Sequence, residues 1–169
     1  KINFDFGPTL LNWMADKSPR IYEAILQADK LSQGFFSGHG SAMAQAYHHI
    51  IMPLAPRDDK YTQILWGIKD FERRFERQPE GMWLPETAVD LETLDIMSEL
   101  GIRFTVLASR QASHVRKIGS TKWVDFSALP LDTTKAYNVQ LPSGRKIAVF
   151  FYNGPIAHAV AFQSLLKSG

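Results

Sequence analysis

A glutamate stands almost directly after a short apolar run in the middle of the chain. Glu86 follows residues 82–84, Met-Trp-Leu, with only Pro85 between them. In parallel β/α folds the catalytic side chains lie at the carboxyl ends of strands, so the first acidic residue after such a run is a candidate catalytic carboxylate. The structural alternative is a glutamate that stabilises the positive end of a following helix. Position and neighbours alone leave both interpretations open.

Aromatic and histidine side chains accompany this glutamate. The ring of Trp83 could stack on a sugar, although a tryptophan buried in a strand is the simpler reading. His39, His48 and His49 could suggest a metal. They lack the His-x-x-x-His spacing that places two ligands on one helix face, and neighbouring residues on a helix point about 100° apart. We therefore expect no metal site.

The elements needed to position these residues follow from sequence periodicity. Residues 2–6 alternate as a strand does, and prolines at positions 8 and 19 begin two predicted helices. Ser41 is expected to cap a helix that continues to Pro53, which would place His48 and His49 near a helix end. Residues 58–75 form the longest predicted helix, apolar along one face and capped by an aspartate at position 58 or 59.

The second half of the chain predicts a βαβ crossover followed by a hairpin. Residues 82–84 and 102–107 read as strands, joined by a helix that Asp90 caps and Gly101 ends. Residues 137–141 and 147–152 flank a Pro-Ser-Gly turn, which predicts a hairpin. A last helix opens at residues 154–155, and its expected inner face carries Ile156, Ala159, Val160 and Leu165. Three tryptophans are expected in the core: Trp13, Trp66 and Trp123.

Composition limits the class of protein. The 169 residues, 45% hydrophobic and 21% charged, suffice for one globular domain over 1–169. The net charge of +2 is scattered, which argues against nucleic acid, and no apolar run is long enough to span a membrane. The chain has no cysteine and no signal-peptide pattern, which favours a cytoplasmic protein. Its ends suggest an internal piece of a longer polypeptide, whose remainder would be its partner.

Three stretches resemble glycoside hydrolase family 57. They are the strand and Pro-x-Leu-Leu helix start at residues 2–11, the segment Tyr47-His48-His49-Ile50-Ile51-Met52-Pro53-Leu54, and the helix and strand that lead from Trp66 to Leu84-Pro85-Glu86. Their order and spacing agree with the family. The Gly-x-x-Glu element that many members carry has no counterpart here, because residues 38–42 contain no carboxylate.

The resemblance implies a fold and a site. The fold would be part of an incomplete seven-stranded β/α barrel of the glycoside hydrolase and deacetylase type, with a β-hairpin insertion. Glu86 would be the nucleophile of a retaining enzyme that acts on α-glucans, a hydrolase or a glucanotransferase without a cofactor. Substrate contacts would come from His49, Trp83 and His39. The family's acid/base aspartate has no match in this sequence, so the chain alone is expected to be inactive on glucans.

Two alternatives stay open. A polysaccharide deacetylase on the related barrel would need a metal held by one aspartate and two histidines. A carbohydrate-binding relic of the barrel would keep Glu86 for structural reasons only. Asp125 and Asp132 follow the predicted crossover, and we interpret both as solvated loop residues.

Overall fold

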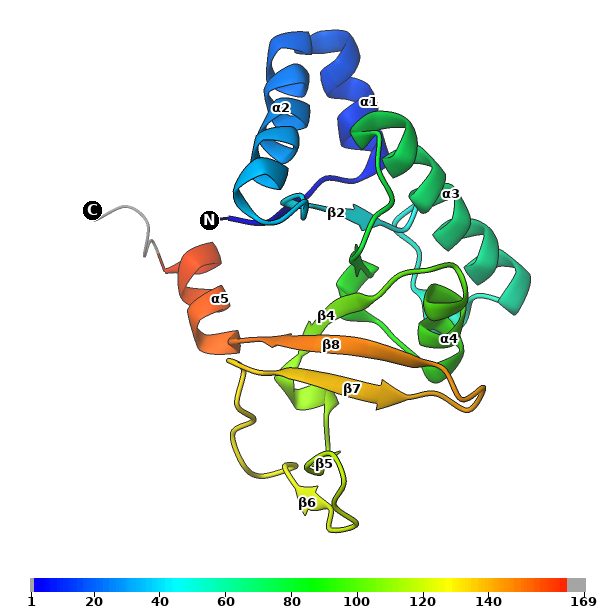
Figure 1. Cartoon of the computed structure of the whole chain (residues 1–169), viewed down its shortest axis with the longest axis vertical. Helices are drawn as coiled ribbons and strands as arrows, with labels where there is room; N and C mark the ends of the chain where they lie inside the picture. Colours follow the sequence, from blue (N-terminus) through cyan, green and yellow to red (C-terminus); the bar gives the residue numbers. More distant parts are fainter. Residues whose placement is uncertain (1, 164–169) are drawn as a thin grey trace.

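The computed structural model describes residues 2–163 and shows an α/β architecture (Figure 1). Its strands are β1 (Phe4–Asp5), β2 (Ala42–Gln45), β3 (Met82–Trp83), β4 (Phe104–Ala108), β5 (His114–Val115), β6 (Val124–Asp125), β7 (Ala136–Gln140) and β8 (Lys146–Tyr152). Its helices are α1 (Pro8–Lys17), α2 (Pro19–Phe35), α3 (Arg57–Phe75), α4 (Leu91–Glu99) and α5 (Gly154–Phe162). Short 3-10 turns are η1 (Met52–Leu54), η2 (Pro85–Thr87) and η3 (Ser109–Gln111).

The strands form small sheets, and the strands next to the candidate site run parallel to one another. β1, β2 and β3 are parallel neighbours, and β4 lies parallel to β8, which pairs antiparallel with β7. A parallel bridge between Gly81 and Phe104 connects the two groups. The α/β class and the hairpin of β7 and β8 are confirmed. The described strands do not close on themselves, so the seven-stranded barrel stays a prediction.

The core lies between the first sheet and the helices that cover it. Strand register places Ala44 and Met82 side by side, and both are buried together with Ile64 and Ile68 of α3. Helix and strand approach closely at Gly67, where an added Cβ would lie 2.1 Å from the Gln45 carbonyl oxygen. Position 67 therefore requires glycine, because any larger residue would clash with the backbone of β2.

The helix predicted from Ser41 to Pro53 is wrong, because residues 42–45 form β2. Ala and Met are strong helix formers, but intrinsic propensity is a weak guide, and tertiary hydrogen bonds override it here. The Ala42 N–H donates to an Asp29 carboxylate oxygen at 2.7 Å, and the Ala44 N–H donates to the Gly81 carbonyl at 3.0 Å. His48 and His49 consequently lie in a loop after a strand and not at a helix end.

The prediction that three tryptophans lie in the core is also wrong. Trp13, Trp66 and Trp123 are 55%, 49% and 58% exposed. The expected inner face of α5 is wrong as well, because Ile156 and Val160 are exposed and α5 has no buried residue. Periodicity finds an apolar stripe on a helix, but it does not show that another element covers the stripe. Leu165 lies outside the described residues.

The helix boundaries agree closely with the predicted ones. Asp90 caps α4 by accepting a hydrogen bond from the Thr93 N–H, and Gly101 follows that helix with a φ of 89°. α3 begins at Arg57 after a cap at Pro56, two or three residues earlier than a cap at position 58 or 59 requires, so both aspartates fall within its first turn. No helix within residues 2–163 is both long and apolar enough to cross a bilayer.

Candidate active site

Glu86 lies on a strained turn at the carboxyl end of β3. Its φ and ψ are 56° and 14°, and Thr87 follows with a φ of 53°. Left-handed backbone is rare for residues other than glycine, especially β-branched ones, and costs roughly 1–3 kcal/mol per residue. The Glu86 side chain is 71% exposed. The turn therefore projects a carboxylate from the edge of the sheet into solvent.

His49 faces this carboxylate from the neighbouring strand. It follows β2 by four residues, and its Nε2 lies 3.2 Å from Oε1 of Glu86. β2 and β3 are parallel and adjacent, so residues that follow both strands meet at the same edge of the sheet. The structure thus brings together two of the predicted site residues, from segments 37 positions apart.

The loop that carries His49 is held by Gln63 of α3. The Gln63 side chain accepts a hydrogen bond from the His48 N–H at 2.8 Å and contacts His48 Nδ1 at 3.2 Å. The Gln63 carbonyl accepts from the Tyr47 N–H at 3.0 Å. The Tyr47 ring meets the Trp66 ring edge to face, with centroids 5.6 Å apart. These contacts fix the peptide just before His49.

The turn that carries Glu86 is held by Gln111 of η3. The Gln111 side-chain amide donates to the Thr87 carbonyl at 2.8 Å, and its oxygen accepts from the Ala108 N–H at 2.8 Å. Sequence reasoning missed both Gln63 and Gln111. A glutamine that holds a loop belongs to no characteristic sequence motif. Each of these two glutamines is also at least 15 positions from the residue to which it is hydrogen-bonded in that loop or turn.

A buried lysine supports the segment that follows the turn. Nζ of Lys60, whose side chain is 4% exposed, donates to Asp90 at 2.7 Å and to Glu92 at 2.8 Å. Burial acts to lower the pKa of Lys60, but these hydrogen bonds outweigh it and raise the pKa above its usual value. For Asp90, burial acts to raise the pKa, and the hydrogen bonds from Lys60 and Thr93 outweigh it, so the pKa is lowered.

Trp83 lies in β3 on the face opposite to its buried neighbour Met82, and it is half-buried. Register pairs Trp83 with Gln45, whose side-chain amide hydrogen-bonds Asp5 of β1. The sheet face turned away from α3 therefore carries an aromatic ring next to polar groups. Glu86 follows at the carboxyl end of the same strand, β3.

His39 lies at the other edge of the sheet. It precedes β2, and its Nδ1 contacts the Glu80 carboxylate at 2.8 and 3.0 Å. Glu80 precedes β3 and also pairs with Arg103, which precedes β4, at 3.2 Å. The structure therefore places His39 with an ion-pair cluster at the amino-terminal edge and does not bring it to Glu86.

Comparison with known proteins agrees with this architecture. The family model of glycosyl hydrolase family 57 matches residues 1–166. The chain belongs to this family. Among curated family 57 relatives, Alpha-amylase 1 of Dictyoglomus thermophilum is 25% identical over 162 residues, which is 95% of this chain and 21% of the amylase. The 4-alpha-glucanotransferase of Thermococcus litoralis is 23% identical over 107 residues, 63% of this chain and 15% of that enzyme. The chain thus spans about a fifth or less of either relative.

Solved structures show the same fold. The crystal structure of the Thermococcus litoralis 4-alpha-glucanotransferase has a TM-score of 0.70 at 20% identity, over 99% of this chain and 24% of that one. A family 57 branching enzyme from Thermococcus kodakaraensis has a TM-score of 0.61 at 18% identity, over 96% of this chain and 40% of that one. At these identities the likeness establishes the fold.

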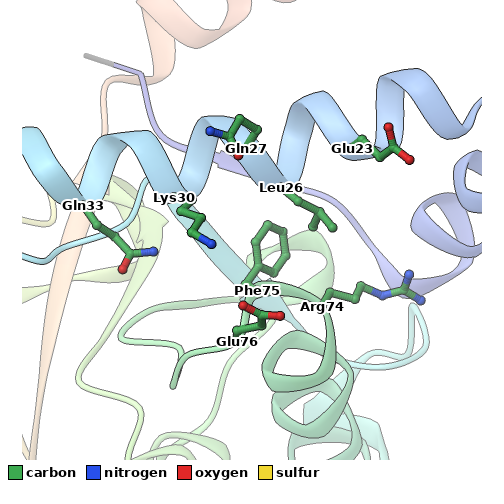
Figure 2. Close-up of a pocket in the computed structure, with 8 residues that line it drawn as sticks. All are labelled: Glu23, Leu26, Gln27, Lys30, Gln33, Arg74, Phe75 and Glu76. Carbon is green, nitrogen blue, oxygen red and sulfur yellow. The ribbon is translucent and has the colours of Figure 1, made fainter.

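A surface hollow lies away from this candidate family 57 site. It has a volume of about 510 Å³ between α2 and the end of α3, where Glu23, Lys30 and Glu76 surround Leu26 and Phe75 (Figure 2). Its lining includes neither His49 nor Glu86. Its polar groups carry mixed charge, and the left-handed backbone of Glu76 (φ 54°) is explained by its place as the C-cap of α3, so we locate the candidate chemistry at the sheet edge. Within residues 2–163, no three histidine or acidic side chains gather as a potential metal site.

Proposed function

We propose that this chain is the nucleophile-bearing part of a retaining enzyme that acts on α-glucans, either a hydrolase or a glucanotransferase. The observation that carries the proposal is the pairing of exposed Glu86 with His49 at the carboxyl edge of parallel strands. Membership of family 57 and the names of the relatives, an α-amylase and a 4-alpha-glucanotransferase, support the choice of substrate.

In the proposed mechanism, a Glu86 oxygen attacks the anomeric carbon of the glucan. A glycosyl ester forms on Glu86 while the bond to the leaving oxygen breaks, and a second carboxyl group protonates that oxygen. Water or a sugar hydroxyl then gives its proton to that second carboxylate, attacks the same carbon and releases Glu86. His49, 3.2 Å from Oε1, orients the carboxylate, and Trp83 is proposed as the platform for a sugar ring.

The acid/base group has to lie about 5–5.5 Å from the nucleophile in a retaining enzyme. We propose that an aspartate from another part of the full-length enzyme supplies it, since this chain spans 21% of the α-amylase. We leave His39 out of the proposed site because it lies at the opposite sheet edge with Glu80. No cofactor takes part in the proposed reaction.

A fluorinated α-glucosyl fluoride tests the nucleophile by itself, because fluoride leaves without help from an acid. We expect intact-protein mass spectrometry to show one added fluoroglucosyl group, located by peptide mapping on Glu86. The Glu86→Gln variant should stay unmodified, and Glu80→Gln, at the other sheet edge, should react as the parent does. Binding of maltooligosaccharide without any labelling would favour the carbohydrate-binding relic instead.

A further inference from the structure

Two successive residues of the candidate site have left-handed backbone, and local hydrogen bonds hold them only in part. Within the turn, the Thr87 N–H donates to the Leu84 carbonyl and the Ala88 N–H donates to the Pro85 carbonyl, both at 3.0 Å. These bonds form only while the backbone keeps this conformation. An unfavourable conformation persists when the surrounding structure fixes it, so a tie from another element is needed.

Gln111 provides such a tie. Its amide nitrogen donates to the carbonyl of Thr87, the residue directly after Glu86, at 2.8 Å. Its amide oxygen accepts from the N–H of Ala108, the last residue of β4, at 2.8 Å. β4 is paired with β8 along its full length, up to Ala108 opposite Tyr152. The second hydrogen bond therefore fixes the Gln111 amide to a rigid sheet.

The Thr87 side chain resists rotation of the same turn. Thr87 as a whole residue is 6% exposed, whereas the Glu86 side chain beside it is 71% exposed. The Gln111 bond to the Thr87 carbonyl holds the peptide between Thr87 and Ala88, and the Thr87 N–H bond to the Leu84 carbonyl holds the peptide between Glu86 and Thr87. With the Thr87 side chain buried between them, these two peptides fix the backbone from which the Glu86 carboxylate points to His49.

We propose that Gln111 is a positioning residue for the nucleophile: it holds the Glu86–Thr87 turn in its left-handed conformation and so keeps the Glu86 carboxylate at His49. This inference rests on the proposed function of Glu86. It adds a third element, η3, to the two loops that carry the site. The two side-chain hydrogen bonds of Gln111 described above go to backbone groups, so it acts through the turn and is not a catalytic residue.

The test compares labelling kinetics of the 169-residue chain with those of two variants. Gln111→Met keeps the length of the side chain and removes both hydrogen bonds. Gln27→Met changes a glutamine of α2 at the distant hollow and serves as the matched control. We expect Gln111→Met to lower the maximal rate of Glu86 labelling by about tenfold while the half-saturating reagent concentration changes by less than about twofold, and Gln27→Met to change neither.

Amide hydrogen exchange gives a readout that does not need reactivity. In Gln111→Met the Thr87 and Ala88 amides should exchange about tenfold faster, while the core amide of Ile96 keeps its protection. If the parent chain is not labelled, the proposed function fails, and faster exchange at Thr87 and Ala88 still supports the tie. If the parent is labelled and Gln111→Met reacts at the same rate, or if exchange at the turn is unchanged, the positioning role is overturned.

Discussion

At the scale of single residues, the buried charges stabilise the fold and the exposed pair is available for chemistry. Asp29 is 1% exposed and accepts hydrogen bonds from Arg77 Nε and Nη2 at 2.8 Å and from the Ala42 N–H at 2.7 Å. Burial acts to raise the pKa of Asp29, but these bonds outweigh it and lower the pKa. Asp29 thus fixes the start of β2, the strand that leads to His49.

The lowered pKa of Asp29 predicts how stability depends on pH. A carboxylate with a lower pKa in the folded state stabilises the protein above its unfolded pKa of about 3.9 and loses this contribution as the pH falls through the folded value. Asp29→Asn should therefore lower the unfolding free energy by about 3 kcal/mol at neutral pH and by clearly less near pH 3. Urea unfolding at both pH values measures this difference. An equal loss at both would show that the charge of Asp29 is not what stabilises the fold.

Buried Lys60, which binds Asp90 and Glu92 in the segment after the Glu86 turn, gives a second prediction at the residue scale. Asp90→Ala removes the cap of α4 and leaves the Lys60 ammonium buried with one partner, so we expect a loss of about 2 kcal/mol. Lys60→Met replaces the buried cation with an apolar chain of similar length and should cost less than about 1 kcal/mol. Denaturant unfolding of both variants tests this order. A larger loss for Lys60→Met would mean that the ion pair itself is strongly stabilising.

At the scale of elements, local patterns predicted most helices and the hairpin. The prolines that begin α1 and α2, the Asp90 cap and the amphipathic face of α3 act within a few residues, so they can be read from sequence. β2 could not be predicted this way. Its strand character comes from partners far along the chain, Asp29 and Gly81, and periodicity over four residues cannot show such pairing.

Alanine substitutions at two helix glycines should change stability in opposite directions, because only one of these glycines contacts a neighbouring strand. Gly67→Ala would push a Cβ against the Gln45 carbonyl and should lower the unfolding free energy by about 3 kcal/mol. Gly34→Ala, in α2, meets nothing within 4 Å and should raise it by about 0.5 to 1 kcal/mol. Thermal or urea unfolding compares the two variants. Equal effects would indicate that α3 can move away from β2 at little cost.

At the scale of the whole molecule, the candidate site forms at one sheet edge, from the segments that follow β2, β3 and β4. Sequence position singled out Glu86 as the first acidic residue after the apolar run 82–84, and the family resemblance assigned it the nucleophile's role and pointed to His49. The left-handed turn and the two glutamine ties could not be predicted, since they depend on distances between segments that are remote in sequence. The same lack of tertiary information led us to expect the exposed tryptophans in the core and gave no sign that His39 lies with Glu80 at the opposite edge of the sheet.

Chemical rescue of a Glu86→Ala variant tests the central claim most directly. If Glu86 is the nucleophile, its removal opens a space on the β face of the sugar, where added azide can attack α-glucosyl fluoride. We expect proton NMR to show β-glucosyl azide, formed by this variant and not by the parent chain or a Glu80→Ala control. Absence of an azide product, or formation of the α anomer, would contradict a role for Glu86 as the nucleophile of a retaining enzyme.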